Sequence, residues 1–575
     1  MKTTIEKLDQ PKIDRSSATY RNLQPFVILL AMECALFFLA AILPLRGLAT
    51  SSSDALLTQL GLWPLFPTFL LFPHSAVSPV LPGLHGPFLY TSTISGKDTA
   101  LLFCAFLSIF LLYLLALRVL PRSIGKRYLL LSTLLLAITC CLVPVVTSSD
   151  IFSYIAYARI GVIYHLNPLT TLPTAIRNDP IFAHLYWIGQ PSAYGPTWTL
   201  LTCLIQWLAV TLGLKGLLSM VLGLRLLGLT MHLGSTALIW STSGHLQRYY
   251  DFLSAEKRLR ATLAFAWNPL LLFEACVNAH NDTTLLFFIL LGIWFLVRNL
   301  RPGYPLRLSL GELLLASALF ALATCLKLNA FVLAPGLLLF LWIQRQKMLH
   351  VLAAAMTYLG LIMLLYAPFW QHGAIFGVVK VNPEASRNIN SPADFLTHLY
   401  NGLAAHFGAR IAAPIGSPAE HLFHTASLAL FLILSILLCW RTVHNPKFIS
   451  TFPRLIRWMA IAWLCYCLTG ASWYWPWYIT TFFGFSALIE ATSDSQQAFS
   501  RFLAWPPVTR LLAFSMLSFY CFSTSAFSHT PLSMLPGFHW ANFSGLWIWT
   551  VPLLVAGTLG LKRIYCALSR SWSLR

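Results

Sequence analysis

The stretch YLLLSTLLLAITCCLVPVVTSSDIFSYIAYARIG, residues 128–161, decides the fold. Its apolar part, residues 128–146, is long enough to cross about 30 Å of hydrocarbon as a helix. Runs of this kind recur along the whole chain, which is 57% hydrophobic and 10% charged, whereas soluble domains carry about 25% charged residues. The sequence therefore predicts an all-α polytopic membrane protein.

The apolar runs predict about 14 transmembrane helices. They cover residues 26–46, 99–118, 128–146, 197–213, 217–241, 260–277, 283–298, 309–325, 329–344, 349–368, 422–440, 455–469, 475–490, 509–526 and 546–562. Two termini on the same side of the membrane require an even number of crossings, but these runs number fifteen. We therefore expect one run between residues 197 and 260 to be broken, re-entrant or double.

The basic residues give an orientation. The formal charge is +20, from 38 Lys and Arg against 18 Asp and Glu, which in a soluble protein would suggest nucleic-acid binding. Here the basic residues cluster in the short gaps between apolar runs, as the positive-inside rule predicts for cytoplasmic loops. We expect both termini in the cytoplasm, a multi-pass plasma-membrane location, and no nucleic-acid partner.

Asp150 follows the apolar run and starts a segment rich in tyrosine. A helix over residues 150–165 would have two different faces, one with Ile151, Ile155, Ala158 and Val162 and the other with Asp150, Tyr154, Tyr157 and Gly161. This predicts an interfacial helix with one face in lipid and one facing a cavity. Asp150 is either a functional acid or only the N-cap of that helix. Arg159 points the opposite way on a straight helix.

A second polar group lies in WNPLLLFEACVNAHNDTTLLFF, residues 267–288. Glu274, Asn278 and Asp282 recur at steps of four and predict one stripe on a helix, with His280 and Asn281 beside its end. Ionisable groups inside a membrane segment are costly and are functional by default. The alternative is a helix end whose polar side chains reach the interface.

Two further segments could contribute to the same site. Lys327, in ATCLKLNAFVLAP (residues 323–335), is a single cation between two apolar runs and is either a phosphate ligand or part of a simple turn. GASWYWPWYITTFFG, residues 470–484, is either an interfacial aromatic belt or a wall for sugar rings or an isoprenoid chain. Its aromatic residues around Pro476 are Trp473, Tyr474, Trp475, Trp477 and Tyr478.

The ordered set of motifs resembles the glycosyltransferase C superfamily, and within it the polyprenyl-phosphomannose-dependent α-(1→6)-mannosyltransferases. The motifs are SSDIFSYIAYARIGVIYHLNPL, YGPTWTLL, WNPLLLFEACVNAHND, LKLNAFVLAP and WYWPWYI, which begin at residues 148, 194, 267, 326 and 473. The resemblance covers roughly residues 128–490. The chain departs from the pattern at Leu169 and at Thr283 and Thr284, which affects the choice of sugar rather than the fold.

The resemblance implies four regions. These are a cytoplasmic basic arm (1–25), two N-terminal spans with an outer loop (26–127), a glycosyltransferase C-like catalytic core with interfacial helices in its outer loops (128–490), and C-terminal spans with a basic cytoplasmic tail (491–575). It also implies an inverting transfer from a polyprenyl-phosphate sugar to a glycan or glycolipid on the outer face.

The resemblance also implies roles for the candidate residues. Asp150 would be the general base, and Lys327 or, second, Arg159 would bind the donor phosphate. Sugar or acceptor contacts would come from Tyr154, Tyr157, Tyr194, Glu274, Asn278, His280, Asn281, Asp282, Trp473, Tyr474, Trp477 and Tyr478. No second acid lies near Asp150 in the sequence, so we expect no metal cofactor, although a divalent metal stays possible.

Three alternatives stay open at this point. A transporter or lipid flippase would show inverted repeats and charges near the membrane midplane, whereas the chain has no evident repeat and its polar residues cluster at the expected outer edge. A structural or assembly subunit could retain a vestigial site. The same enzyme class could also use arabinose, glucose or galactose instead of mannose, because hydroxyl contacts decide the sugar.

Overall fold

The computed structural model describes residues 15–42, 96–143, 148, 150–214, 216–382, 386–408, 416–492, 505–522, 545–550, 552, 554, 555, 557 and 558. Several predicted segments lie outside these residues. They are the basic arm before residue 15, nearly all of the outer loop 47–98, most of the loop 527–545, and the basic tail after residue 558.

The described residues are helical almost throughout. The N-terminal half contains α1 (Arg15–Ile42), α4 (Gly96–Val119), η2 (Leu120–Arg122), α5 (Lys126–Cys141), α6 (Asp150–Val162), η3 (Pro173–Ile176), η4 (Pro180–His184), α7 (Pro196–Thr211), α8 (Leu217–Tyr249), α9 (Ala255–Ala266), α10 (Pro269–Leu272), η5 (Phe273–Val277) and α11 (Asp282–Val297). The C-terminal half contains α12 (Leu310–Thr324), η6 (Leu328–Leu333), α13 (Ala334–Ile343), α14 (Met348–Tyr366), η7 (Ala367–Phe369), η8 (Gln371–Phe376), α15 (Gly377–Val381), α16 (Pro392–His406), α17 (Pro418–His444), η10 (Pro446–Phe448), α18 (Phe452–Cys465), η11 (Tyr466–Gly470), η12 (Pro476–Ile479), α19 (Thr480–Thr492) and α21 (Trp505–Phe522).

Local sequence signals start many of these helices. Ser309 and Glu312 form a capping box at the start of α12, and Asn268 and Ser417 cap α10 and α17. Within the described residues the only β contact is an isolated bridge between Ile389 and Trp473. The prediction of an all-α membrane protein is confirmed.

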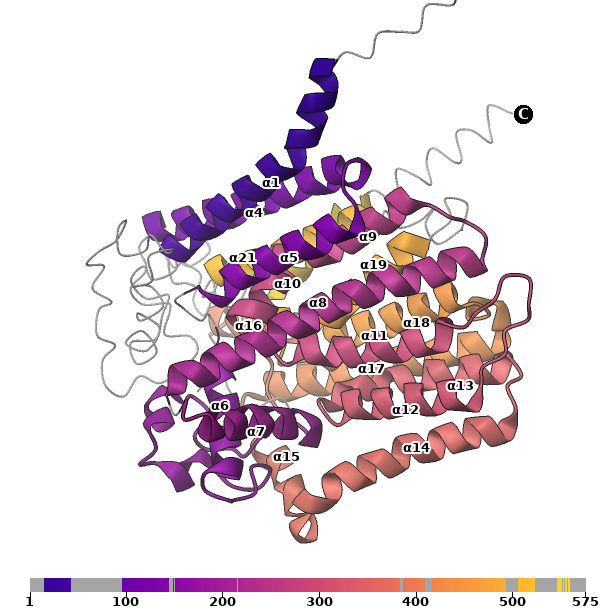
Figure 1. Cartoon of the computed structure of the whole chain (residues 1–575). Coiled ribbons are helices and arrows are strands. Elements are labelled where there is room, and N and C mark those ends of the chain that lie inside the picture. The colour runs from indigo at the N-terminus through magenta and orange to yellow at the C-terminus, as the bar shows by residue number, and fades with distance from the viewer. Residues whose placement is uncertain are drawn as a thin grey trace, which may run out of the picture.

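The longer helices run side by side across the molecule (Figure 1). α8 and α12 both pack on α11, α14 packs on α12, and α19 packs on α9 and α18. α1 and α4 lie together along one edge of the bundle, and α14 lies along the opposite edge in this view. One hydrophobic core extends from Ile28 to Trp549, so elements from both ends of the chain pack into the same body.

The predicted count of about 14 spans is not supported. Four described helices are long and apolar enough to cross a membrane, namely Ala100–Arg122, Leu217–Tyr249, Met348–Phe369 and Pro418–His444, and a bent pair would make five. Many other apolar runs form short helices, such as α5, α12 and α18 with 16, 15 and 14 residues. At 1.5 Å per residue these are about 21–24 Å long, less than the roughly 30 Å of a hydrocarbon core.

The irregular membrane segment is not where the sequence suggested. Residues 197–260 contain the 16-residue α7 and the 33-residue α8. The break falls later, because Pro269–Val277 and Asp282–Val297 meet at 111°. This bend brings the polar residues between them into the interior.

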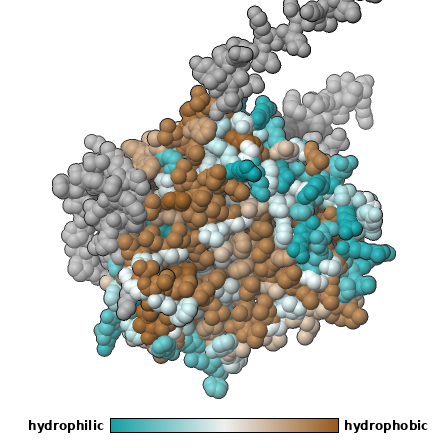
Figure 2. Space-filling view, viewed as in Figure 1, coloured by the Kyte–Doolittle hydropathy of each residue, from teal (hydrophilic) through white to brown (hydrophobic). Residues whose placement is uncertain are grey.

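The basic loops and α6 lie at opposite ends of the bundle (Figure 1). The loops α8–α9, α11–α12, α13–α14 and α17–α18 meet at one end, and basic residues lie in the last three of them: Arg298, Arg301, Arg307, Arg345, Lys347 and Lys447. Figure 2 shows hydrophilic residues gathered toward that end and hydrophobic residues over much of the rest of this face. The molecule therefore has one polar, basic end and a separate end where α6, α15 and α16 lie.

Candidate active site

A cavity of about 980 Å³ lies at the α6 end. It is lined by the start of α6, the loop before α7, the turn before η6, the ends of α14 and α21, the segment η8–α15, and the aromatic stretch before η12. Among its described lining residues Asp150 is the only carboxylate and Lys327 the only Lys or Arg. The cavity thus brings together residues that are 177 positions apart in the sequence.

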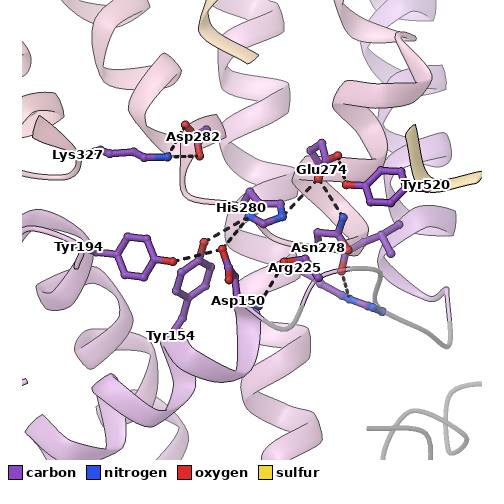
Figure 3. A network of polar contacts seen from close by, with 12 residues as sticks. Asp150, Tyr154, Tyr194, Arg225, Glu274, Asn278, His280, Asp282, Lys327 and Tyr520 are labelled. Carbon is purple, nitrogen blue, oxygen red and sulfur yellow. Dashed lines mark hydrogen bonds and ion pairs between the residues drawn. The ribbon is translucent and has the colours of Figure 1, made fainter. Parts of the chain in front are cut away.

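Asp150 is the first residue of α6, and its carboxylate enters the cavity wall (Figure 3). The side-chain oxygen of Ser148 accepts a hydrogen bond from the Asp150 backbone N–H at 3.3 Å, so Ser148 supplies the cap at this helix start. Tyr194 donates its hydroxyl to Asp150 Oδ2 at 3.3 Å. Burial raises the pKa of the Asp150 carboxyl to about 6, although the Lys327 charge and the Trp187 and Tyr194 hydrogen bonds oppose the rise.

The prediction that one side of α6 faces lipid is wrong. Ile151, Ile155 and Ala158 are each 0% exposed, because α6 packs against α7, α8 and η4. The second face is also largely covered: the Tyr157 hydroxyl donates to the Gln190 carbonyl at 3.1 Å, and Tyr154 lies behind Tyr194 and Trp198. Only the start of α6 reaches the cavity.

Gly195 joins the two sides of the cavity. Its backbone N–H donates to the Leu326 carbonyl at 3.1 Å, and the Thr197 N–H donates to the Cys325 carbonyl at 3.1 Å. A Cβ added at Gly195 would lie 2.0 Å from the Cys325 oxygen, so only glycine allows this approach. The turn containing Tyr194 and the turn containing Lys327 are therefore in direct backbone contact.

Lys327 is held between an acid and an aromatic ring. Its Nζ lies 3.2 Å from both carboxylate oxygens of Asp282 and 3.6 Å from the centre of the Tyr478 ring (Figure 3). Asp282 is fully buried, whereas the Lys327 side chain is 13% exposed and lines the cavity. The ammonium group is thus fixed in position and able to meet an anion in the cavity.

The predicted stripe of Glu274, Asn278 and Asp282 on one helix is wrong. Residues 273–277 form a π-helical turn, Ala279 has a φ of 54°, and α11 starts anew at Asp282. Asn278 still donates a hydrogen bond to Glu274 at 3.0 Å, but the Asp282 carboxylate accepts a hydrogen bond from Lys327 instead. The π turn and the left-handed residue add a bend that a regular helical pattern does not foresee.

Arg225 of α8 holds this bend against α5. It is 0% exposed and donates to the carbonyls of Val277, Cys141 and Val143 at 2.9, 2.9 and 2.6 Å. Three residues further along α8, a Cβ on Gly228 would lie 1.9 Å from the Ala275 carbonyl, so α8 touches the π turn closely. α8 therefore fixes the relative positions of the segment leading to Asp150 and the segment carrying Glu274.

The remaining predicted site residues form a buried layer next to the cavity rather than its surface. Glu274, Asn278, His280, Asn281 and Asp282 are at most 1% exposed, and none of them lines the cavity. The ring of His280 stacks on Trp477 at 3.8 Å, with its two nitrogens directed toward Asp150 and Glu274 (Figure 3). These side chains lie next to Asp150 and Lys327 on the side away from the cavity.

The aromatic stretch after Gly470 is part of the cavity wall. Trp473, Trp475, Trp477 and Tyr478 line it, while Tyr474 is fully buried and donates its hydroxyl toward the sulfur of Met516. Trp475 and Trp477 stack with centroids 5.0 Å apart. Hydrogen bonds from Ile389 N–H to Ser472 and from Tyr474 N–H to Ile389 hold the stretch in place.

Arg159 lies away from the cavity. It makes a bidentate ion pair with Asp179, with distances of 2.8–3.0 Å, and Tyr164 donates to the same carboxylate at 2.9 Å. The pair is largely buried, with side-chain exposures of 11% and 1%. The structure therefore does not bring Arg159 together with Asp150, and Lys327 is the cation that meets the cavity.

Four residues near the site were not predicted from the sequence. Tyr520 lines the cavity and donates to Glu274 at 2.5 Å, and Trp187 and Asn329 also line it. Arg225 is the fourth, and its isolated charge within an apolar run was a usable signal. Asn329 lies two residues after Lys327 in a segment that the sequence did single out, whereas Tyr520 and Trp187 sit in stretches with no distinguishing pattern.

Among the residues that the structure describes, no group of three or more His, Cys, Asp or Glu side chains is arranged to hold a metal ion. The expectation of metal independence stays a prediction.

Comparison with known proteins finds one similarity. Residues 74–345, just under half of the chain, match the family model described as alpha-(1->6)-mannopyranosyltransferase, N-terminal domain. No curated protein and no solved structure matches the chain. The matched range contains Asp150, Tyr194, His280, Asp282 and Lys327. Over these residues the chain is similar to a mannosyltransferase family, and its long apolar helices are those of a membrane protein, which supports an enzyme of the mannosyltransferase kind.

Proposed function

We propose that the protein transfers mannose from a polyprenyl-phosphate carrier to a hydroxyl of a glycan or glycolipid, on the outer face of the plasma membrane. The observation that carries this proposal is the pairing of one carboxylate, Asp150, with one Lys, Lys327, in a cavity of about 980 Å³. A transfer of this kind needs a base for the acceptor proton and a cation for the leaving phosphate.

The reaction follows from these two groups. The acceptor oxygen forms a bond to the anomeric carbon, the bond from that carbon to the phosphate oxygen breaks, and its electron pair leaves with the polyprenyl phosphate. Asp150 takes the acceptor proton, and Lys327 stabilises the phosphate charge. A single displacement inverts the anomeric centre, and the phosphate needs no proton to leave.

The apolar part of the cavity supports a lipid-linked donor. From Lys327 the wall continues over Leu328, Met363, Trp370 and Phe376. These four side chains are 49–74% exposed. An isoprenoid chain bound here would keep its phosphate near Lys327 and its tail in contact with the surrounding lipid.

The positions of the basic loops support action on the outer face. They lie at the end of the bundle opposite α6, and the positive-inside rule assigns such loops to the cytoplasm. Asp150 then belongs to the extracytoplasmic end, where glycan acceptors of the cell envelope are found. The family description favours an enzyme over the transporter alternative.

The test is mannosyl transfer in membranes supplied with polyprenyl-phosphomannose, comparing wild type with Asp150→Asn at matched expression. We expect transfer by wild type and its loss in Asp150→Asn. Asp251→Asn is the control, because Asp251 is exposed at the opposite end and its φ of 52° suits Asn. Equal activity of Asp150→Asn and wild type would exclude Asp150 as the base, and transfer only from another lipid-linked sugar would contradict the donor.

A further inference from the structure

Asp150 is one end of a chain of polar side chains that continues through His280 and Glu274 to Tyr520 (Figure 3). His280 Nδ1 lies 3.9 Å from Asp150 Oδ2, and His280 Nε2 lies 3.5 Å from Glu274 Oε2. The hydroxyl of Tyr520 donates to the other oxygen of Glu274 at 2.5 Å. Because Tyr520 lines the cavity, the chain starts and ends at the cavity but passes behind its wall.

The geometry points to a proton relay: we propose that the proton taken by Asp150 passes through the His280 ring to Glu274. This inference rests on the proposed function. Asp150 must lose its proton before each new turnover, and the cavity in front of it is filled by donor and acceptor during transfer. A path behind the wall takes the proton from Asp150 while the cavity is still occupied, and Glu274 holds it until the products leave. Tyr520, which lines the cavity, then accepts the proton from Glu274 and gives its own hydroxyl proton to cavity water.

The His280 ring is fixed in an orientation that suits a relay. It is 1% exposed and stacks on Trp477 with ring centroids 3.8 Å apart and planes 14° apart. This stacking aims one nitrogen at each carboxylate. The Tyr154 hydroxyl also lies 3.4 Å from Nδ1 and limits rotation of the ring. His280 cannot contact a sugar from this position. We therefore give it a role in the relay instead of the sugar contact that the sequence suggested.

Glu274 accepts hydrogen bonds that stabilise its ionised form, so its carboxylate starts each cycle without a proton. Asn278 donates to Oε2 at 3.0 Å, and Tyr520 donates to Oε1 at 2.5 Å. Both are neutral donors directed at the carboxylate, and His280 Nε2 faces it from a third side. With the proton of the neutral ring on Nε2, Nδ1 accepts the proton from Asp150 while Nε2 gives its own proton to Glu274. One proton enters the ring, one leaves it, and no bond between heavy atoms changes.

Neither ring nitrogen forms a hydrogen bond to its carboxylate in the structure, where Nδ1 lies 3.9 Å from Asp150 and Nε2 lies 3.5 Å from Glu274. A movement of the Asp150 carboxylate by about 1 Å brings it within hydrogen-bonding distance of Nδ1. Such tightening is usual when substrate binds. The other charged groups around the ring are Asp282 and Lys327, which form their own ion pair, and Tyr194 bonds to Asp150 on the cavity side.

The experiment uses Glu274→Gln in the full-length protein, with polyprenyl-phosphomannose as donor. Gln has nearly the same shape as Glu but cannot take a proton from the ring. We expect the first turnover of Glu274→Gln to proceed at nearly the wild-type rate, because Asp150 starts ionised, and later turnovers to slow at least tenfold. Added imidazole should restore the steady-state rate in proportion to its concentration, and the KM for the donor should not change.

A milder pair of variants keeps the test valid if Glu274→Gln does not fold. Tyr520→Phe removes one donor to Glu274 and should show a smaller slowing of later turnovers. Its control is Tyr113→Phe, because Tyr113 is a buried tyrosine whose hydroxyl donates to the Ala264 carbonyl at 2.7 Å, remote from the site.

The outcomes separate the relay from the proposed function. Equal slowing of first and later turnovers without imidazole rescue would show that Glu274 acts only on structure, and unchanged turnover would also overturn the relay. In both cases wild-type transfer and its loss in Asp150→Asn would leave the proposed function intact. Wild-type protein that transfers no mannose from the carrier would overturn the proposed function and, with it, the relay.

Discussion

Gly195→Ala should abolish most of the activity although it removes no polar side chain from the site. The added Cβ would lie 2.0 Å from the Cys325 carbonyl oxygen and 2.7 Å from its carbon. Because real Cβ atoms essentially never come closer than 3.0 Å to another heavy atom, the two turns must separate by about 1 Å. This movement increases the distance between the turn of Tyr194 and the turn of Lys327.

The expected cost follows from that displacement. A misplacement of about 1 Å between groups that act together can lower a rate by roughly 10²-fold. The hydrogen bonds from Gly195 to Leu326 and from Thr197 to Cys325, both 3.1 Å, would also lengthen. We therefore expect kcat for mannosyl transfer to fall about a hundredfold.

The assay is the initial rate of mannose transfer at saturating donor, with thermal unfolding measured in parallel. Gly189→Ala is the matched control, since Gly189 lies in the same loop and a Cβ there would have nothing within 4 Å. Folded Gly195→Ala protein with a rate within about twofold of Gly189→Ala would refute the reasoning, because the backbone contact would then not set the geometry of the site.

Four further predictions test individual groups. Because Asp150 must be ionised to act as a base and its pKa is about 6, the transfer rate should fall roughly tenfold as the pH is lowered from 7 to 5, and a flat profile of initial rates would contradict this. Lys327→Met should lower kcat/KM for the donor by about 10²–10³-fold, with Lys327→Arg less affected, and equal values for all three proteins would exclude Lys327 from phosphate stabilisation. Arg159→Ala should destabilise the fold by about 3–5 kcal/mol, because it leaves Asp179 buried without its cation. The KM for the donor should stay constant. A raised KM at an unchanged melting temperature would instead indicate that Arg159 binds the donor phosphate. Removal of divalent ions with EDTA should leave transfer unchanged, and a loss of activity that Mg²⁺ or Mn²⁺ restores would overturn metal independence.

The sequence predicted the all-α membrane class and some of the residues that line the cavity. Asp150 and Lys327 could be found because a charge next to an apolar run is costly and needs a reason. Trp473, Trp477 and Tyr478 could be found because they form a dense aromatic cluster around Pro476. In each case the signal comes from neighbouring residues in the sequence, and the fold brings these residues together at one cavity.

Other features depend on contacts that periodicity does not encode. The stripe from Glu274 to Asp282 fails because a π turn and the left-handed Ala279 interrupt the helix. Tyr520 reaches Glu274 across 246 positions of sequence, and nothing near it distinguishes it from other helix tyrosines. The span count fails because an apolar run can equally form a short helix packed inside the protein, as α18 does.

Under the proposed function, the ion pair between Lys327 and Asp282 has a consequence for how the protein binds the sugar-loaded and the empty lipid carrier. The Asp282 carboxylate, 3.2 Å from the ammonium, already balances that positive charge, so an ionised Asp150 gives the group of three a net charge of −1. A donor phosphodiester brings one further negative charge, whereas a phosphate monoester carries about −1.5 to −2 at pH 7. Once the proton taken during transfer has left Asp150 and its carboxylate is ionised again, electrostatic repulsion is greater for the product than for the donor, and release of the empty lipid is favoured.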